Sequence, residues 1–121
     1  KVQAGAQFFI TQPIFNPAEA ARFHQAYQAN AGADLQQPVF WGVQVLEQGA
    51  VMLSGVPQGT REELDGGRSG VDIALEILSK LGDAGIYAFY LVPPILRGGA
   101  RNYEAAQEVL AEVSRRTASR L

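Results

Sequence analysis

The chain contains three apolar runs, and these predict its architecture. They cover residues 8–12, 38–46 and 86–92, and each is rich in β-branched or aromatic side chains with no charged residue inside it. Near-continuous apolar runs of this kind predict strands that are buried on both faces, as in parallel sheets. Elsewhere apolar residues recur at helical spacing. The predicted helices cover residues 16–29, 60–65, 71–81 and 103–114.

Capping residues support these helix boundaries. Asn16 followed by Pro17 combines an N-cap residue with proline at the first helical position. Thr60 followed by Glu63 has the spacing of a capping box. Asn102 is placed to cap the last helix.

Glycines and the two ends of the chain add local detail. Gly42 interrupts the second apolar run, which predicts a close approach of another part of the chain to its backbone. Residues 1–7 resemble the last turn of a helix with Gly5 at its C-cap, which suggests that further sequence precedes them. The third helix is expected to end at Gly82 and Gly85, and the basic tail over residues 115–121 is expected to fray.

The order of elements is therefore β, α, β, a short α, α, β and α, in one domain over residues 1–121. Apolar strands that alternate with helices predict a parallel sheet with helical crossovers. Three strands cannot close a barrel, whose common form has eight. The sheet is therefore either small and open or part of a larger (β/α)8 barrel.

Composition narrows the possible functions. The chain has 121 residues, with 10 Lys and Arg against 12 Asp and Glu and a net charge of −2, so a strongly basic nucleic-acid binder is excluded as the default. The absence of cysteine excludes disulfides, thiol catalysis and Cys-ligated metals, and a single histidine excludes a His-rich metal site. No apolar run reaches the roughly 18 residues of a membrane helix, and no signal peptide is visible. We therefore expect a cytoplasmic protein with no membrane or nucleic-acid partner.

Binding sites in parallel α/β folds lie at the carboxyl ends of the strands. Gln12 ends the first strand, and its amide both donates and accepts hydrogen bonds, which suits the mixed edge of a heterocycle. A bond from Gln12 to nearby loop backbone is the alternative. Glu47 follows the second strand with no second carboxylate near it, which favours a loop-capping role over acid–base catalysis.

Arg97 and Arg101 flank a glycine-rich loop between the third strand and the last helix. Backbone N–H groups, a helix amino terminus and two guanidiniums can bind phosphate there. The loop matches neither the P-loop nor the dinucleotide fingerprint, so a plain turn is equally open. His24 lies in an apolar helical stripe and is interpreted as a packed or surface residue and not as a catalytic one. The aromatic residues of the strands are interpreted as core: Phe40, Trp41, Tyr87, Phe89 and Tyr90.

Four motifs together resemble a known family. Residues 1–6 read K-V-Q-A-G-A, residues 10–12 read I-T-Q, residues 70–74 read G-V-D-I-A, and residues 90–94 read Y-L-V-P-P, followed by an arginine and by Y-E-A-A. This series resembles the methylenetetrahydrofolate reductase family, and the P-I-F-N after I-T-Q resembles the reductase part of bacterial homocysteine methyltransferase/reductase fusions. The similarity spans nearly the whole chain but only the C-terminal part of the family's domain.

The resemblance implies the C-terminal part, about three strands, of a (β/α)8 barrel that lacks its N-terminal half. Enzymes of the family pass hydride from NAD(P)H through FAD to methylenetetrahydrofolate, giving methyltetrahydrofolate for methionine synthesis. By position, Lys1 matches a lysine that contacts the flavin, and Gln12 matches the glutamine that hydrogen-bonds the pterin and the nicotinamide in turn. Arg97 lies within a residue of an arginine that contacts folate. No catalytic residue and no metal ligand is expected in this segment, so the segment alone is expected to be inactive.

Two functions stay open. In the first, the segment joins the missing half of the barrel or a second copy as a homo-oligomer, because bare apolar strands need covering. In the second, it is a non-catalytic pterin- or anion-binding or assembly module derived from that barrel. Its second strand reads G-V-Q-V-L-E-Q-G, where the reductases typically have a G-I-L-P-like segment and another folate-contacting glutamine. We hypothesise that Gln44 and Glu47 take over polar roles there.

Overall fold

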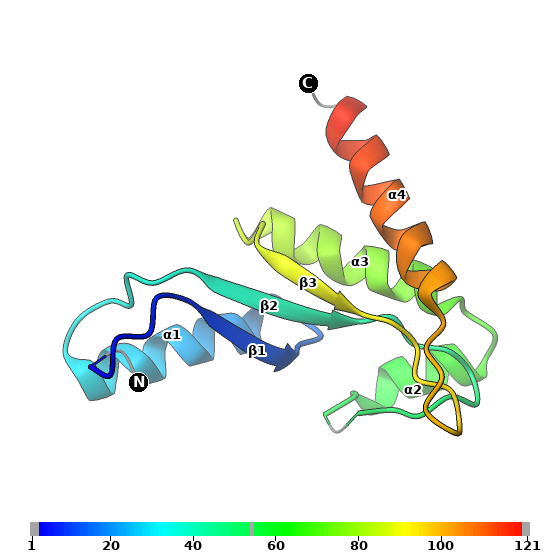
Figure 1. The fold of residues 1–121 in the computed structure, drawn as a ribbon, viewed down its shortest axis with the longest axis horizontal. Coiled ribbons are helices and arrows are strands. Elements are labelled where there is room, and N and C mark those ends of the chain that lie inside the picture. The colour runs from blue at the N-terminus through cyan, green and yellow to red at the C-terminus, as the bar shows by residue number, and fades with distance from the viewer. Residues whose placement is uncertain (1–2, 54, 120–121) are drawn as a thin grey trace.

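Strands and helices alternate along the chain (Figure 1). The computed structural model describes residues 3–53 and 55–119. The elements in chain order are β1 (Phe9–Pro13), α1 (Pro17–Ala31), β2 (Val39–Gln44), α2 (Gln58–Asp65), α3 (Gly70–Asp83), β3 (Phe89–Val92) and α4 (Tyr103–Ser119). Within these residues the strands form one three-stranded parallel sheet, which confirms the predicted α/β class.

The sheet has the order β1-β2-β3, so that each strand lies beside its neighbour in sequence. Ile10 pairs with Phe40, and Gly42 pairs with Tyr90. The register then shifts, because Pro13 pairs with Gly42: two residues of β1 lie between the pairs Ile10–Phe40 and Pro13–Gly42, against one residue of β2. This extra residue is a β-bulge in the edge strand.

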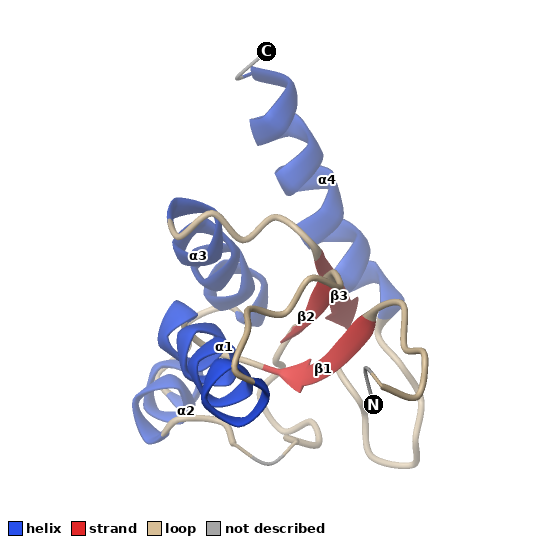
Figure 2. Ribbon diagram, turned by 90° about the vertical axis from the view of Figure 1, so that its left-hand side faces the viewer, coloured by secondary structure: helices blue, strands red, loops and turns tan. Residues whose placement is uncertain are grey.

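Helices α1 and α3 lie on the same side of the sheet (Figure 2). On α1, Phe23 and His24 meet the ring of Trp41 edge to face, with ring centroids 5.5 and 5.8 Å apart. Helix α3 packs against β2, and α4 packs against α3. The core is mainly aliphatic, with Trp41 and Phe15 as its buried aromatic residues, and the apolar stripe predicted for α3 contributes to it. It includes Val39, Trp41, Val43, Ala74, Ile77, Leu81 and Val109.

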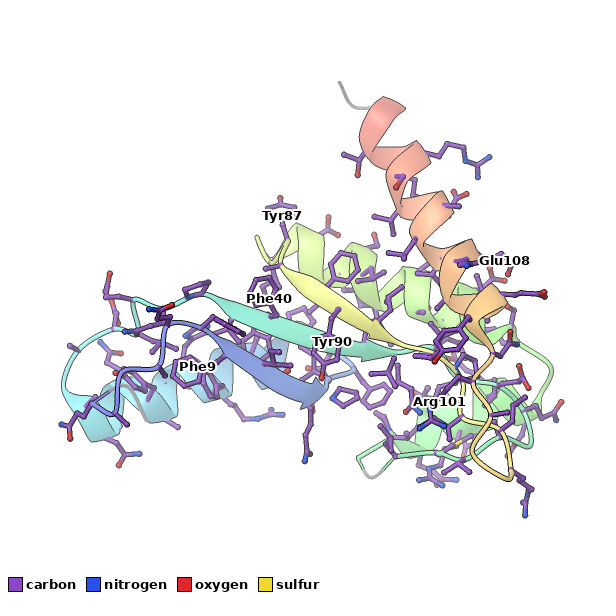
Figure 3. The ribbon with its side chains drawn as sticks, viewed as in Figure 1. Phe9, Phe40, Tyr87, Tyr90, Arg101 and Glu108 are labelled. Atoms are coloured by element: carbon purple, nitrogen blue, oxygen red, sulfur yellow. The ribbon has the colours of Figure 1, made fainter. Side chains whose placement is uncertain are left out.

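The opposite face of the sheet is exposed at its amino-terminal end. Ile10 is 63% exposed and Phe40 is 38% exposed, while Tyr90 lies over the middle of this face (Figure 3). We call the surface formed by Ile10, Phe40 and Tyr90 the open face. The interpretation of the strand aromatics as core is wrong for Phe40 and for Tyr87, which is 75% exposed. A run that is apolar at every position does not reveal which of its faces is covered.

The ends of α1 and α2 show which capping pattern operates. The capping box belongs to α1, where Asn16 Oδ1 accepts from Ala18 N at 2.9 Å and Glu19 Oε2 accepts from Asn16 N at 3.3 Å. The capping box predicted at Thr60 is wrong, because α2 begins at Gln58, after Pro57, without a side-chain cap.

The later helices are longer than predicted. Gly82 lies inside α3, which continues to Asp83. Helix α4 continues to Ser119, so the fraying expected from residue 115 is wrong over residues 115–119. Both Arg115 and Arg116 pair with Glu112, one turn earlier, and such pairs support the last turns of a helix. At the other end of the chain, residues 3–5 form a turn with a left-handed φ of 94° at Gly5, as expected for a C-cap glycine.

A charged cluster joins the end of α2 to α3. Arg68 pairs with Glu63 at 3.1 Å and also with Glu76, which in turn pairs with Lys80 at 3.2 Å. Hydrogen bonds from Arg68 and then from Lys80 hold the pKa of Glu76 below its usual range. These side chains are exposed, so the cluster orients the two helices more than it stabilises them.

Candidate functional site

Two joined loops lie at the carboxyl end of the sheet. Val51, after β2, forms an antiparallel bridge with Ile95, after β3, in which Val51 N donates to Ile95 O at 2.8 Å. Ile95 also bridges Arg101, so the glycine-rich loop folds back on itself. Gly98 and Gly99 have left-handed φ values of 91° and 95° in this turn. The loop therefore needs its glycines for its own backbone conformation.

Both arginines of this loop donate to backbone carbonyls. Arg97 Nε donates to Gly49 O at 3.4 Å, and the guanidinium of Arg101 donates to Gly99 O (Figure 3). The plain-turn interpretation accounts for Arg101, which holds its own turn. Arg97 is exposed and its bond to Gly49 is long, so its other N–H groups are available to a carboxylate or phosphate.

Glu47 ties the loop after β2 to the start of α4. Its Oε1 accepts from Asn102 Nδ2 at 2.7 Å, and Asn102 Oδ1 accepts from Ala105 N at 3.3 Å in the first turn of α4. The N-cap predicted at Asn102 is confirmed, whereas the Glu47 side chain bonds the start of α4 and not the loop after β2 that it was predicted to cap. Their pairing could not be foreseen, because no local pattern joins residues so far apart in sequence.

Gln44 is buried without a hydrogen-bond partner. It is 1% exposed at the carboxyl end of β2, beside Val92, and neither polar atom of its side chain has a partner in residues 3–53 and 55–119. Leaving a buried polar group unpaired costs about 1–3 kcal/mol. An apolar side chain at this position would avoid that cost. The presence of an unpaired amide there supports the hypothesis that Gln44 has a polar role.

Replacing Gln44 by leucine is expected to raise the free energy of unfolding by about 1–2 kcal/mol, because leucine fills similar space without unpaired polar atoms. Urea unfolding followed by circular dichroism measures this change. Gln107→Leu, at an exposed position of α4, is the control and is expected to change stability by less than about 0.5 kcal/mol. A loss of stability in Gln44→Leu would show that the amide finds a partner in solution.

Gln12 lies apart from Arg97. It is the exposed penultimate residue of β1 and lines a groove of about 810 Å³ between β1 and α1, which does not include Arg97. No contact joins the two side chains in the described part of the chain. The groove has an apolar floor and a polar rim. Its lining includes Phe9, Ile14, Phe23, Trp41, Glu19, Arg22, Tyr27 and Asn30.

Sequence reasoning missed the tyrosine beside Gln12. Tyr90 Oη donates to Thr11 O across the sheet. The sequence feature that pointed to this tyrosine was the glycine at position 42. A Cβ on Gly42 would lie 2.8 Å from Tyr90 Oη and 3.2 Å from Pro13 Cα, so only glycine leaves room for the ring. The predicted close approach at Gly42 is therefore confirmed, although its partner could not be named from the sequence.

The flavin contact predicted at Lys1 lies outside the described residues. In the part of the chain that the structure does describe, no three His, Cys, Asp or Glu side chains gather as a metal site requires. None of the helices described there has the length and hydropathy needed to cross a membrane. Comparisons with protein-family models, with curated proteins and with solved structures found no match to this chain.

Proposed function

We propose that this chain supplies the last three β/α units of a flavin-dependent (β/α)8 reductase that acts on methylenetetrahydrofolate, with Gln12 and Arg97 on the folate side. The proposal rests on the motifs described above, such as I-T-Q at residues 10–12. It rests equally on one structural observation, which is the way the helices are distributed about the sheet.

In a (β/α)8 barrel each strand pairs with its sequence neighbours and the helices form an outer ring. The order β1-β2-β3, with α1 and α3 on one side, has this arrangement. A doubly wound sheet would instead reverse its strand order and carry helices on both faces. In the proposed barrel the open face is part of the interior, and β1 and β3 are the edges that pair with the remaining strands.

The folate contacts follow from the side-chain chemistry. The amide of Gln12 can donate to a pterin ring nitrogen or carbonyl and accept from a ring N–H at the same time, which fixes the orientation of the ring. The guanidinium of Arg97 can bind the carboxylates of the folate tail. These two groups lie at the ends of different strands, as ligand contacts in barrels usually do.

The described residues do not form a FAD site by themselves. Arg101 holds its own turn, Arg97 is assigned to folate, and the open face carries no charged side chain. Lys1, the residue matched to the flavin, is not among them. In the proposed enzyme FAD supplies the hydride transfer, and residues elsewhere in the complete barrel have to hold most of it.

Titration of the chain with 5-methyltetrahydrofolate in a calorimeter tests the proposal. Saturable binding is expected, and Gln12→Ala and Arg97→Ala are each expected to weaken it about tenfold, because each removes a ligand hydrogen bond from a partly desolvated site.

Two controls match these variants. Arg61 donates from Nε to Val56 O at 3.4 Å, the same donor atom and distance as in the bond of Arg97. Gln36 is, like Gln12, an exposed glutamine. Arg61→Ala and Gln36→Ala are expected to leave the affinity unchanged. A folded chain that does not bind the folate, or that loses affinity equally in the controls, would contradict the assignment.

The binding or assembly module is the second candidate, and the exposed apolar residues of the open face favour it. A parallel titration with FAD, followed by flavin fluorescence, separates the two. FAD binding that weakens in Lys1→Ala supports the reductase. Folate binding without any FAD binding favours the non-catalytic module.

A further inference from the structure

Three hydrogen bonds hold the backbone on both sides of the Gln12 side chain, directly or through the Thr11 hydroxyl. Tyr90 Oη donates to Thr11 O, Gly42 N donates to Thr11 Oγ1 at 3.1 Å, and Thr11 Oγ1 donates to Gln12 O at 2.8 Å. The amide of Gln12 itself makes no hydrogen bond within the described residues. The backbone that carries it is therefore fixed from both sides, while the amide stays available to a ligand.

These bonds hold the bulge in β1. Between Ile10 and Pro13 the strand has one residue more than β2, so Gly42 N no longer faces a backbone carbonyl in register. Thr11 Oγ1 takes the place of that carbonyl. Bulges bend a strand and change where its side chains point, and they are common beside active sites.

Glycine at position 42 is what allows Tyr90 to reach β1. A Cβ there would lie 2.8 Å from Tyr90 Oη and 2.9 Å from Cζ, closer than such atoms can approach. The ring of Tyr90 therefore crosses the central strand only because β2 has no side chain at this point (Figure 3). Residues from all three strands thus hold the segment Thr11–Gln12.

We propose that Tyr90 and Thr11 are positioning residues for Gln12, which fix the bulge so that the Gln12 amide is preorganised for the pterin edge. This inference rests on the proposed function. Binding through a mobile segment would also cost the conformational freedom of its backbone, and a backbone that is already fixed avoids that cost. Removing the Tyr90 hydroxyl should therefore weaken folate binding through Gln12, although the hydroxyl touches no ligand.

A double-mutant cycle with Tyr90→Phe and Gln12→Ala tests the inference, with 5-methyltetrahydrofolate as the probe. Tyr90→Phe is expected to raise the dissociation constant about fivefold in the wild-type background and to leave it unchanged in the Gln12→Ala background. Thr11→Val is expected to behave in the same way. Tyr87→Phe, which changes an exposed tyrosine, is the matched control and is expected to have no effect.

A ligand-free readout separates this inference from the proposed function. The side-chain amide resonances of Gln12 are expected to move in Tyr90→Phe and not in Tyr87→Phe. Moved resonances in a chain that binds no folate would support the positioning role and contradict the reductase. The positioning role is overturned by unmoved resonances, or by a Tyr90→Phe effect on binding that is equally large when Gln12 is absent.

Discussion

Replacing Gly70 by alanine is expected to lower the free energy of unfolding by about 3 kcal/mol or more. A Cβ on Gly70 would lie 1.6 Å from Leu46 O and 2.5 Å from Leu46 C. Both partners are backbone atoms, so no side-chain rotation relieves the clash. Helix α3 has to move away from the end of β2, and the core packed beneath it opens. Urea unfolding followed by the fluorescence of the buried Trp41 measures the loss.

Gly59→Ala is the matched control for this prediction. Gly59 lies in α2, has nothing within 4 Å of its added Cβ and has no left-handed backbone conformation. Alanine in a helix is favoured over glycine by up to about 1 kcal/mol, so this variant should be unchanged or slightly more stable. An equal loss in both variants would show that the effect at Gly70 does not come from the contact with Leu46.

The periodicity of the sequence was sufficient for the α/β class, the parallel sheet and the order of elements, because each element forms where its local pattern predicts it. The apolar stripe of α3 and the N-caps at Asn16 and Asn102 all appear where the pattern predicts them. The errors arise where local signals compete. Thr60 and Glu63 match a capping box, but Pro57 already sets the extended backbone that starts α2.

The candidate site was less predictable because its contacts are long-range. That Gln12 lies at the end of β1 and Arg97 after β3, with β2 between these strands, follows from the order of elements. The contacts of the site depend on how loops and strands meet in space. They are the bond of Arg97 to Gly49, the bond of Glu47 to Asn102 and the path of Tyr90 across the sheet. The burial of Gln44 was equally hidden, because an amide in an apolar strand is compatible with either face.

Replacing Leu81 by alanine is expected to cost about 2–5 kcal/mol of unfolding free energy, in the upper half of that range. Leu81 is 1% exposed at the end of α3. Its carbonyl accepts from Ala84 N at 3.1 Å and from Ile86 N at 2.8 Å, so the chain reversal around it is fixed by backbone bonds. The surroundings therefore cannot collapse into the space that alanine leaves. In denaturant unfolding, we expect a lower midpoint concentration and an unchanged dependence of the unfolding free energy on denaturant concentration.

Leu110→Ala makes the same chemical change on α4, where Leu110 is 48% exposed, and it should cost less than about 1 kcal/mol. Comparing the Leu81 and Leu110 variants also tests whether copies of the chain associate through α4 or through the open face. In the proposed barrel the partner lies against β1, β3 and the open face, and α4 stays on the outside. The cost at Leu110 should then be independent of protein concentration. A cost at Leu110 that approaches that at Leu81 and grows with concentration would mean that copies of the chain associate through α4, which a completed barrel does not require.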